Sequence, residues 1–273
     1  MRTEDILPSF TTQPPEDIQV RLTQAIEVCV AAGDLVKKIR DEGLFHTTKG
    51  VLDTVTQADL ASEKYIQQCL ADSFPQDTFY GEEFQRDFSP ESVWVIDPID
   101  GTVNFASGSH YWCISLAWVT NGSCQLGLIY APDLQKLFIG VNGCGSFCGK
   151  VPLQIQGLEE EQQVIVGVGT SARTSFDGYL RTLSLLQQQG FEHRRLGSGA
   201  LMLAEVAAGS LHGYFEPHMN SWDALAGLLL VREAGGIHLD FLTAAEKIRS
   251  GNRVLASCKS ISDHLSSLLE DIN

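Results

Sequence analysis

The chain has no long hydrophobic run and few basic residues, and each scarcity excludes a class of protein. No stretch of its 273 residues approaches the roughly 18 consecutive apolar residues that a membrane-spanning helix needs. Lys and Arg number 19 against 34 Asp and Glu, which gives a formal net charge of -15. Because nonspecific binding to nucleic acids depends on Lys and Arg, we expect no nucleic acid partner and no membrane partner. The same charge would repel any anionic ligand unless bound divalent cations reverse the local field.

The cysteines show no pairing pattern. There are seven, an odd number, and none lies in a C-x-x-C pair, so the sequence predicts reduced thiols rather than disulfides or a structural zinc site. At the N-terminus, no basic segment precedes an apolar run. We therefore expect no secretory signal peptide and a cytoplasmic location.

The distribution of apolar residues predicts two halves of different organisation, residues 1–152 and 153–273. In the first half, one long amphipathic helix is expected over residues 16–40 and a second over residues 59–70. Short apolar segments separated by turn residues then predict an antiparallel meander of strands. In the second half strands alternate with helices, which is typical of a layered α/β unit. We expect the halves to form one compact unit with the functional site between them.

The most informative segment is Trp-Val-Ile-Asp-Pro-Ile-Asp-Gly-Thr-Val-Asn-Phe, residues 94–105. Residues 93–96 are typical of a buried strand, yet Asp97 and Asp100 follow at its end, where unpaired charge is unfavourable. Pro98 restricts the backbone between the two, and we expect Asp100 to be the N-cap of a helix. Carboxylates suit hard cations such as Mg²⁺, and the amides of a helix N-terminus suit phosphate. Together they predict metal-assisted phosphate chemistry.

Other acidic residues occur in similar places, at the start of a predicted helix or just after a strand. They are Asp59, the pair Glu82 and Glu83, and Asp223. Each alone is explained by a carboxylate that complements the helix dipole. That explanation does not cover the two carboxylates after the buried strand. The spacing in the sequence leaves open whether the four clusters meet in space.

Three segments are ordered as in the inositol monophosphatase family, which the chain resembles from about residue 16 to about residue 258. They are Gly81-Glu82-Glu83, Asp97-Pro98-Ile99-Asp100-Gly101-Thr102, and Trp222-Asp223 followed by Glu233-Ala234-Gly235-Gly236. The family is part of the lithium-sensitive, Mg²⁺-dependent phosphatase superfamily. The resemblance implies an α/β (α+β) fold, a layered αβαβα sandwich of the sugar-phosphatase type. It also implies two or three Mg²⁺ ions, inhibition by lithium and a homodimer.

The resemblance also implies roles for individual residues. The metal ligands would be the side chains of Glu82, Asp97, Asp100 and Asp223 and the backbone carbonyl of Ile99. The catalytic residues would be Glu82 and Thr102, which orient the attacking water, and Asp59 beside the metals. The amides of Gly101 and Thr102 match a phosphate cradle, and Lys49 matches a supporting residue. The substrate contacts would be Asp100, Gly197, Ser198, Gly199, Glu216 and Asn220.

The expected activity is that of a phosphoric monoester hydrolase, similar to inositol-1-monophosphatase, in which a metal-activated water attacks a small polyol or sugar phosphate. Asn220 stands where the animal enzymes carry a histidine. Because both side chains can hydrogen-bond a polyol, this change leaves the substrate class intact and the substrate open. Residues 105–108, Phe-Ala-Ser-Gly, are similar to the histidinol-phosphate phosphatase branch. Histidinol phosphate, fructose 1,6-bisphosphate and nucleotide 3′-phosphates therefore remain alternatives, as does a catalytically silent binding module.

Overall fold

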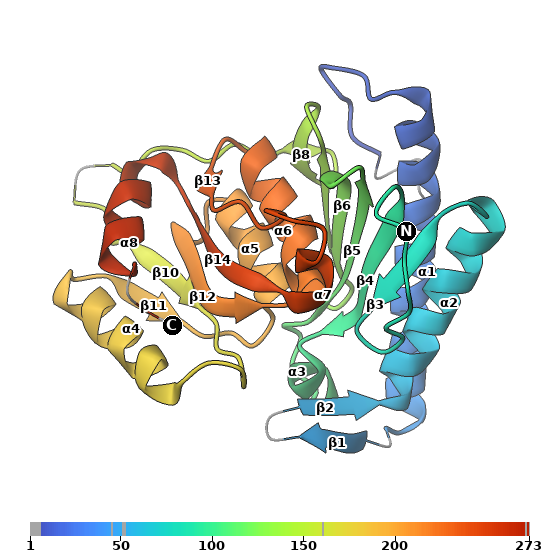
Figure 1. Ribbon diagram of the computed structural model, residues 1–273, viewed down its shortest axis with the longest axis horizontal. Helices are drawn as coiled ribbons and strands as arrows, with labels where there is room; N and C mark the ends of the chain where they lie inside the picture. The colour runs from blue at the N-terminus through green and yellow to red at the C-terminus, as the bar shows by residue number, and fades with distance from the viewer. Residues whose placement is uncertain (1–6, 45, 51–52, 160, 271, 273) are drawn as a thin grey trace.

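The computed structural model describes residues 7–44, 46–50, 53–159, 161–270 and 272, with the backbone alone described for 46–50 and 53–54. In Figure 1, layers of helices and sheets alternate from the right of the molecule to the left. No helix in these ranges combines the length and the apolar character needed to cross a membrane.

Two long helices, α1 (Glu16–Glu42) and α2 (Gln57–Ser73), form the first layer (Figure 1). A hairpin of β1 (His46–Gly50) and β2 (Asp53–Thr56) connects them. The start of α2 is fixed by a capping box, in which the Thr56 side chain accepts from the Ala58 amide and Asp59 accepts from the Thr56 amide. Both helices predicted for the first half of the chain are therefore confirmed.

The second layer is a seven-stranded sheet. Its strands follow the chain in spatial order: β3 (Thr78–Gly81), β4 (Val93–Asp100), β5 (Cys113–Thr120), β6 (Ser123–Ala131), β7 (Lys136–Val141), β8 (Gly145–Cys148) and β9 (Val151–Pro152). β3 is parallel to β4, and every later pair is antiparallel, which confirms the predicted meander.

Strand β4 is buried at every position because both faces of this sheet are covered by helices. Trp94 and Ile96 belong to the core beneath α1 and α2. Val93 and Val95 point to the other core, with α5 (Gly199–Ala207) and α6 (Ser221–Glu233). The continuous apolar run before the two aspartates thus reflects a central strand.

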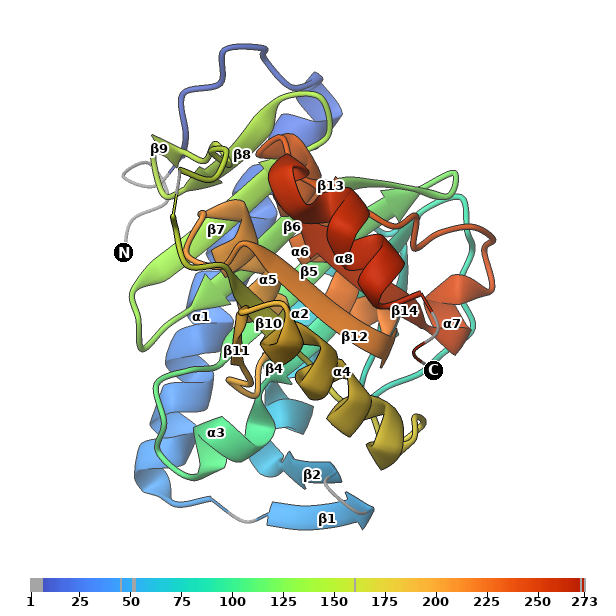
Figure 2. The ribbon, with the colours of Figure 1, turned by 90° about the vertical axis from the view of Figure 1, so that its left-hand side faces the viewer.

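Helices α5 and α6 form the third layer. The fourth layer is a five-stranded sheet in the order β11, β10, β12, β14, β13. Its strands are β10 (Ile165–Val168), β11 (Glu192–Arg194), β12 (Gly213–Met219), β13 (Ile237–His238) and β14 (Asn252–Ser257). Tyr214 and Ala256 face α5 and α6, whereas Phe215 and Leu255 face the outer helices. Those helices, α4 (Phe176–Gln188) and α8 (Ser262–Leu268), lie in front of the sheet in Figure 2. The expected αβαβα sandwich is confirmed.

The short elements include one correction to the sequence analysis. They are α3 (Thr102–Ala106), α7 (Lys247–Ser250) and the 3-10 helix η2 (Lys259–Ile261). The expectation that Asp100 caps a helix was wrong, because Asp100 is the last residue of β4 and Gly101 is the N-cap of α3. Gly101 adopts a left-handed conformation with φ of 92°, which favours glycine over any other residue.

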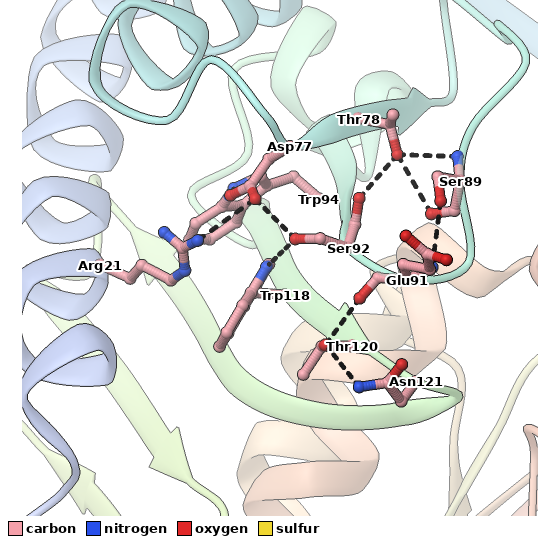
Figure 3. A network of polar contacts seen from close by, with 10 residues as sticks. All are labelled: Arg21, Asp77, Thr78, Ser89, Glu91, Ser92, Trp94, Trp118, Thr120 and Asn121. Carbon is pink, nitrogen blue, oxygen red and sulfur yellow. Dashed lines mark hydrogen bonds and ion pairs between the residues drawn. The ribbon is translucent and has the colours of Figure 1, made fainter.

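A network of polar contacts joins α1 to the start of β4 (Figure 3). Asp77 accepts from Arg21, from the Ser92 hydroxyl and from the Trp94 indole, at 3.2, 2.6 and 2.9 Å. The Trp118 indole donates to the Ser92 hydroxyl at 2.9 Å. The Arg21 guanidinium also lies between the rings of Phe74 and Trp118, 4.3 and 4.4 Å from their centroids. The network therefore holds α1 against the sheet at the end of β4 remote from Asp97 and Asp100.

Candidate metal centre and phosphate site

Asp97 and Asp100 share one site because β4 is irregular between them. In a regular strand, side chains three residues apart point to opposite faces of the sheet. The register between β4 and β5 shifts between Asp97 and Asp100, where Pro98 has no N–H to offer the ladder. The Ile99 amide donates instead to Asp97 Oδ1 at 2.9 Å. The proline thus explains how two carboxylates of one strand reach the same point.

The third carboxylate comes from the second half of the chain. Asp223 lies in the first turn of α6. The Ser115 hydroxyl donates to the Trp222 carbonyl at 2.8 Å, and the Trp222 ring packs 5.7 Å from the ring of Tyr80, so the start of α6 is fixed on the seven-stranded sheet. Ligand oxygens of Asp97, Asp100 and Asp223 lie within 4.8 Å of one another. Several carboxylate oxygens at such separations are the ligands that a hard divalent cation requires.

Among the residues whose side chains the structure describes, no basic group forms an ion pair with these carboxylates. None of the ion pairs formed by the described residues includes Asp97, Asp100 or Asp223. Burial, followed by the charges of Glu82, Asp223 and Asp100, raises the pKa of Asp97 well above its usual value. Burial and the charge of Asp100 raise the pKa of Asp223 to about 7. Since anions brought together in this way need a compensating cation, the donor set fits Mg²⁺.

Asp100 links the two halves of the chain. Its Oδ2 accepts from the Ser198 hydroxyl at 2.6 Å and from the Ala200 amide at 2.7 Å, and its Oδ1 accepts from the Gly199 amide at 3.3 Å. Burial raises the pKa of Asp100, while these hydrogen bonds from the start of α5 oppose the rise. The carboxylate therefore takes the place of a capping side chain for α5.

Glu82 lies at the edge of this cluster. Its amide donates to the Ile96 carbonyl at 3.1 Å, which places it directly after β3. Its side chain lines the same cavity as Asp223, and its charge is the first among the neighbouring charges that raise the pKa of Asp97. It is not one of the three residues whose ligand atoms lie within 4.8 Å of one another. The predicted role of Glu82 as a metal ligand stays a prediction.

Thr102, Asp59 and Ile99 meet beside the carboxylates. The Thr102 hydroxyl lies 3.0 Å from Asp59 Oδ1 and 3.0 Å from the Ile99 carbonyl oxygen. Asp59 Oδ2 accepts from the amide and the hydroxyl of Thr56. Burial is the main cause that raises the pKa of Asp59, and these hydrogen bonds oppose it. The structure thus brings Asp59 from α2 against the motif at the end of β4, a contact that the sequence left open.

Two adjoining cavities open beside the carboxylates. The inner one, of about 220 Å³, is lined by five of the predicted substrate contacts: Asp100, Gly197, Ser198, Gly199 and Glu216. Asn220, the sixth predicted contact, lines the outer cavity of about 640 Å³. Asp223 and Glu216 line both, so the two cavities meet at the metal centre. The Lys49 side chain, predicted as a supporting residue, lies outside the described residues.

Comparison with known proteins agrees with this geometry. The sequence profile of the inositol monophosphatase family matches residues 17–273. The chain belongs to the inositol monophosphatase family. Among its relatives, the Nus factor SuhB of Haemophilus influenzae is 33% identical over 253 residues, which cover 90% of this chain and 95% of the relative.

Solved structures of related proteins have the same fold. The extragenic suppressor protein SuhB of Bartonella henselae matches with a TM-score of 0.83 and 28% identity, covering 92% of this chain and 99% of that chain. The IMPase of Thermotoga maritima matches with a TM-score of 0.82 and 28% identity, covering 93% and 98%. Membership of the inositol monophosphatase family supports a phosphatase activity that depends on metal, typically Mg²⁺. The name Nus factor carried by relatives leaves the expected absence of a nucleic acid partner a prediction.

Two residues that shape this site were missed in the sequence analysis. Glu63 is fully buried in α2, and its carboxylate accepts from the amides of Glu83 and Phe84 at 2.8 and 3.0 Å, which fixes the loop that carries Glu82. Tyr214 donates to Glu216 Oε2 at 2.6 Å and so orients that carboxylate. Glu63 follows Asp59 by four residues, a spacing that places two acids on one helix face. That spacing could have indicated the role of Glu63, whereas no sequence pattern indicated the role of Tyr214.

Proposed function

We propose that the protein hydrolyses a small phosphate monoester in a Mg²⁺-dependent reaction, with inositol monophosphate or a similar polyol or sugar phosphate as substrate. The observation that carries the proposal is the convergence of Asp97, Asp100 and Asp223 within 4.8 Å. Membership of the inositol monophosphatase family supports the same chemistry. Carboxylates from both halves of the chain contribute, which supports the interpretation that residues 1–152 and 153–273 form one unit around the site.

The proposed ligands divide into a tight group and two neighbours. Asp97, Asp100 and Asp223 would hold the cations, with Glu82 and the carbonyl of Ile99 beside them. When bound, Mg²⁺ supplies a water of lowered pKa and neutralises charge that develops on the leaving oxygen. Asp97 and Asp100 are buried and Asp223 is half-buried, and none of the three forms an ion pair among the described residues, so a bound cation would also relieve the repulsion among them.

Thr102 would orient the attacking water. Its hydroxyl donates to Asp59 or to the Ile99 carbonyl, both 3.0 Å away, so its oxygen can still accept a hydrogen bond from the water. Asp59 is held by the capping box of α2 and cannot turn away without breaking that cap. Glu82, which lines the outer cavity, would accept a hydrogen bond from the other hydrogen of the water. Positioning of this kind contributes to rate by fixing the direction of attack.

The inner cavity supports a small alcohol as leaving group. Its volume of about 220 Å³ is below the roughly 300–1,000 Å³ typical of sites for drug-sized ligands. Burial raises the pKa of Glu216 to about 8, so this carboxyl can be protonated near neutral pH and can then donate to, as well as accept from, a hydroxyl. The amides of Gly101 and Thr102 at the start of α3 would bind the phosphate. Asn220 and Glu216 would then contact hydroxyls of the polyol.

The decisive experiment is a turnover assay with Mg²⁺ against phosphate esters of inositol, histidinol, sugars and nucleotides, comparing kcat/KM. We expect Asp223→Asn to abolish release of phosphate while the circular dichroism spectrum stays unchanged. Asp17→Asn is the matched control, because Asp17 also lies in the first turn of a helix, α1, outside both cavities. Equal activity of both variants would show that Asp223 has no role in turnover. Inhibition by millimolar lithium and a dimeric mass in solution are further expected results.

The relatives named Nus factor SuhB favour a second candidate, in which the chain acts by binding another molecule rather than by turnover. The carboxylate cluster argues against a purely silent module, since a binding surface alone has no need of three carboxylates within 4.8 Å of one another. Absence of Mg²⁺-dependent phosphate release from every ester tested would favour the binding role.

A further inference from the structure

The outer cavity is larger than a small polyol phosphate requires, and groups of both charges line it. It measures about 640 Å³ against about 220 Å³ for the inner cavity. Its lining includes the carboxylates Glu82, Glu216 and Asp223, and its other charged residues are the arginines Arg173 and Arg195. In a chain of net charge -15, two arginines in the lining of one cavity are a local exception.

Arg173 has hydrogen-bond partners but no carboxylate partner among the described residues. One guanidinium nitrogen donates to Asn220 Oδ1 at 2.8 Å and lies 3.3 Å from His218 Nε2. These contacts hold the side chain over the cavity and leave its charge uncompensated. Five N–H groups in a planar fork suit a phosphate or a carboxylate, and two contacts occupy few of them.

Arg195 lies where the two cavities meet, because it lines both. It is exposed and forms no ion pair among the described residues, although its charge lowers the pKa of Glu216 slightly against the stronger effect of burial. The preceding residue, Arg194, differs: it pairs with Glu192 at 3.0 Å and lines neither cavity. Two adjacent arginines therefore have different environments, and only the second faces the site.

We propose that Arg173 and Arg195 bind a second anionic group of the substrate, so that the preferred substrates are phosphate monoesters that carry another phosphate or a carboxylate. This inference rests on the proposed phosphatase function and names its substrate class. The ester phosphate lies at the carboxylate cluster, and the second anion lies in the outer cavity between the two guanidinium groups. Charge-assisted bonds to arginine are strong enough to discriminate between a substrate with the second anion and one without it.

Arg173 has a second conceivable role, which the test must separate from the first. It donates to Asn220, and Asn220 in turn hydrogen-bonds Asp223. Loss of Arg173 could therefore disturb a metal ligand and slow turnover of every substrate alike. A positioning role lowers kcat for all esters, whereas binding of a second anion changes kcat/KM only for the substrates that carry it.

The experiment compares two pairs of substrates, each with and without the second phosphate. The pairs are inositol 1-phosphate with inositol 1,4-bisphosphate, and fructose 1-phosphate with fructose 1,6-bisphosphate. Initial release of phosphate is measured with saturating Mg²⁺ for the unaltered protein and for Arg173→Gln, Arg173→Lys and Arg195→Gln. Arg194→Gln is the matched control. Because a bisphosphate offers two ester groups, a twofold preference counts as none.

We expect the unaltered protein to favour the bisphosphate of at least one pair by about tenfold in kcat/KM. Arg173→Gln and Arg195→Gln should each remove most of this preference, Arg173→Lys should keep part of it, and Arg194→Gln should keep all of it. A preference of twofold or less in both pairs overturns the inference. It is also overturned if the arginine variants lose kcat/KM equally for the monophosphate and the bisphosphate of a pair. Absence of phosphate release from all four compounds by the unaltered protein instead overturns the proposed function itself.

Discussion

The carboxylate of Asp100 accepts the amide hydrogen of Ala200 at 2.7 Å, which joins the end of β4 to the start of α5. The Ser198 hydroxyl binds the same oxygen at 2.6 Å. One predicted metal ligand thus also caps a helix in the other half of the chain. Movement of α5 relative to the seven-stranded sheet would change the orientation of Asp100, so metal affinity and the packing of the two halves should be coupled.

Ser198→Ala tests this coupling. It removes a hydrogen bond to a charged group, worth about 1.5–3 kcal/mol, and leaves Asp100 less firmly held. We expect a lower free energy of unfolding and a higher Mg²⁺ concentration for half-maximal activity. Both are measured directly, by urea unfolding and by Mg²⁺ titration of turnover.

The matched control for Ser198→Ala is Ser175→Ala. Ser175 caps α4 by accepting from the Gly178 amide at 3.0 Å, and it lines neither cavity. Removing that cap should lower the free energy of unfolding by about 1 kcal/mol without changing the Mg²⁺ midpoint. An unchanged Mg²⁺ midpoint in Ser198→Ala as well would contradict the coupling.

Gly101→Ala should impair both stability and turnover. Gly101 has φ of 92°, and a Cβ there would lie 3.1 Å from the Gly197 carbonyl oxygen and 3.2 Å from Ser198 Cβ. The left-handed conformation alone makes alanine unfavourable by about 1–2 kcal/mol, and the contacts add to this by pushing the two halves apart. Gly108→Ala separates the two effects, because Gly108 has φ of 80° with no atom within 4 Å of a built Cβ. Equal losses in both variants, measured by urea unfolding, would show that the contact with Gly197 has no effect.

The metal-free protein should become less stable as the pH rises from about 5 to about 8. Burial raises the folded-state pKa of Asp223 to about 7, whereas an unfolded aspartate has a pKa of about 3.9. Between these values the folded state binds more protons than the unfolded state, so the free energy of unfolding falls as the pH rises. Asp97, whose pKa is also raised, acts in the same direction.

The measurement is the thermal midpoint of unfolding in a chelator across this pH range, for the unaltered protein and for Asp223→Asn. The thermal midpoint of Asp223→Asn should exceed that of the unaltered protein by an amount that grows toward pH 8, because the amide of the variant cannot ionise. Added Mg²⁺ should stabilise the unaltered protein more than the variant, since only the former keeps all three carboxylates. A difference that does not change with pH would show that the folded protein does not raise the pKa of Asp223.

The sequence predicted the site to the extent that its signals are local. Asp97, Pro98 and Asp100 lie in one short segment, and the buried strand before them is visible as an apolar run. By contrast, the contact between Asp100 and Ser198 joins residues 98 positions apart and depends on how α5 packs against the sheet. The start of α3 was placed one residue early because a left-handed glycine, rather than an acidic side chain, begins the helix. Contacts of this kind follow from packing between elements, on which periodicity carries no information.

Asp77→Ala should destabilise the protein strongly and spare the chemistry of the site. Asp77 pairs with Arg21 at 3.2 Å, with a side chain only 3% exposed, and accepts from Ser92 and Trp94 as well (Figure 3). Its loss leaves the Arg21 charge against two aromatic rings without a carboxylate partner. Removing one partner of a buried ion pair lowers the free energy of unfolding by about 3–5 kcal/mol. Urea unfolding should show this loss, while kcat of the folded fraction stays within about twofold, because the network lies at the end of β4 remote from Asp97 and Asp100.

Asp87→Ala is the control for that prediction, because it also removes an aspartate paired with an arginine. Asp87 lies 2.7 Å from Arg249, but its side chain is fully exposed. Exposed pairs contribute about 0–1 kcal/mol, so this variant should unfold at nearly the same urea concentration as the unaltered protein. If Asp77→Ala lowered the free energy of unfolding as little as Asp87→Ala, solvent would have to reach Arg21 in the variant. The network would then fill space between α1 and the sheet without fixing their relative position, and α1 should show faster amide hydrogen exchange than β4 in the unaltered protein.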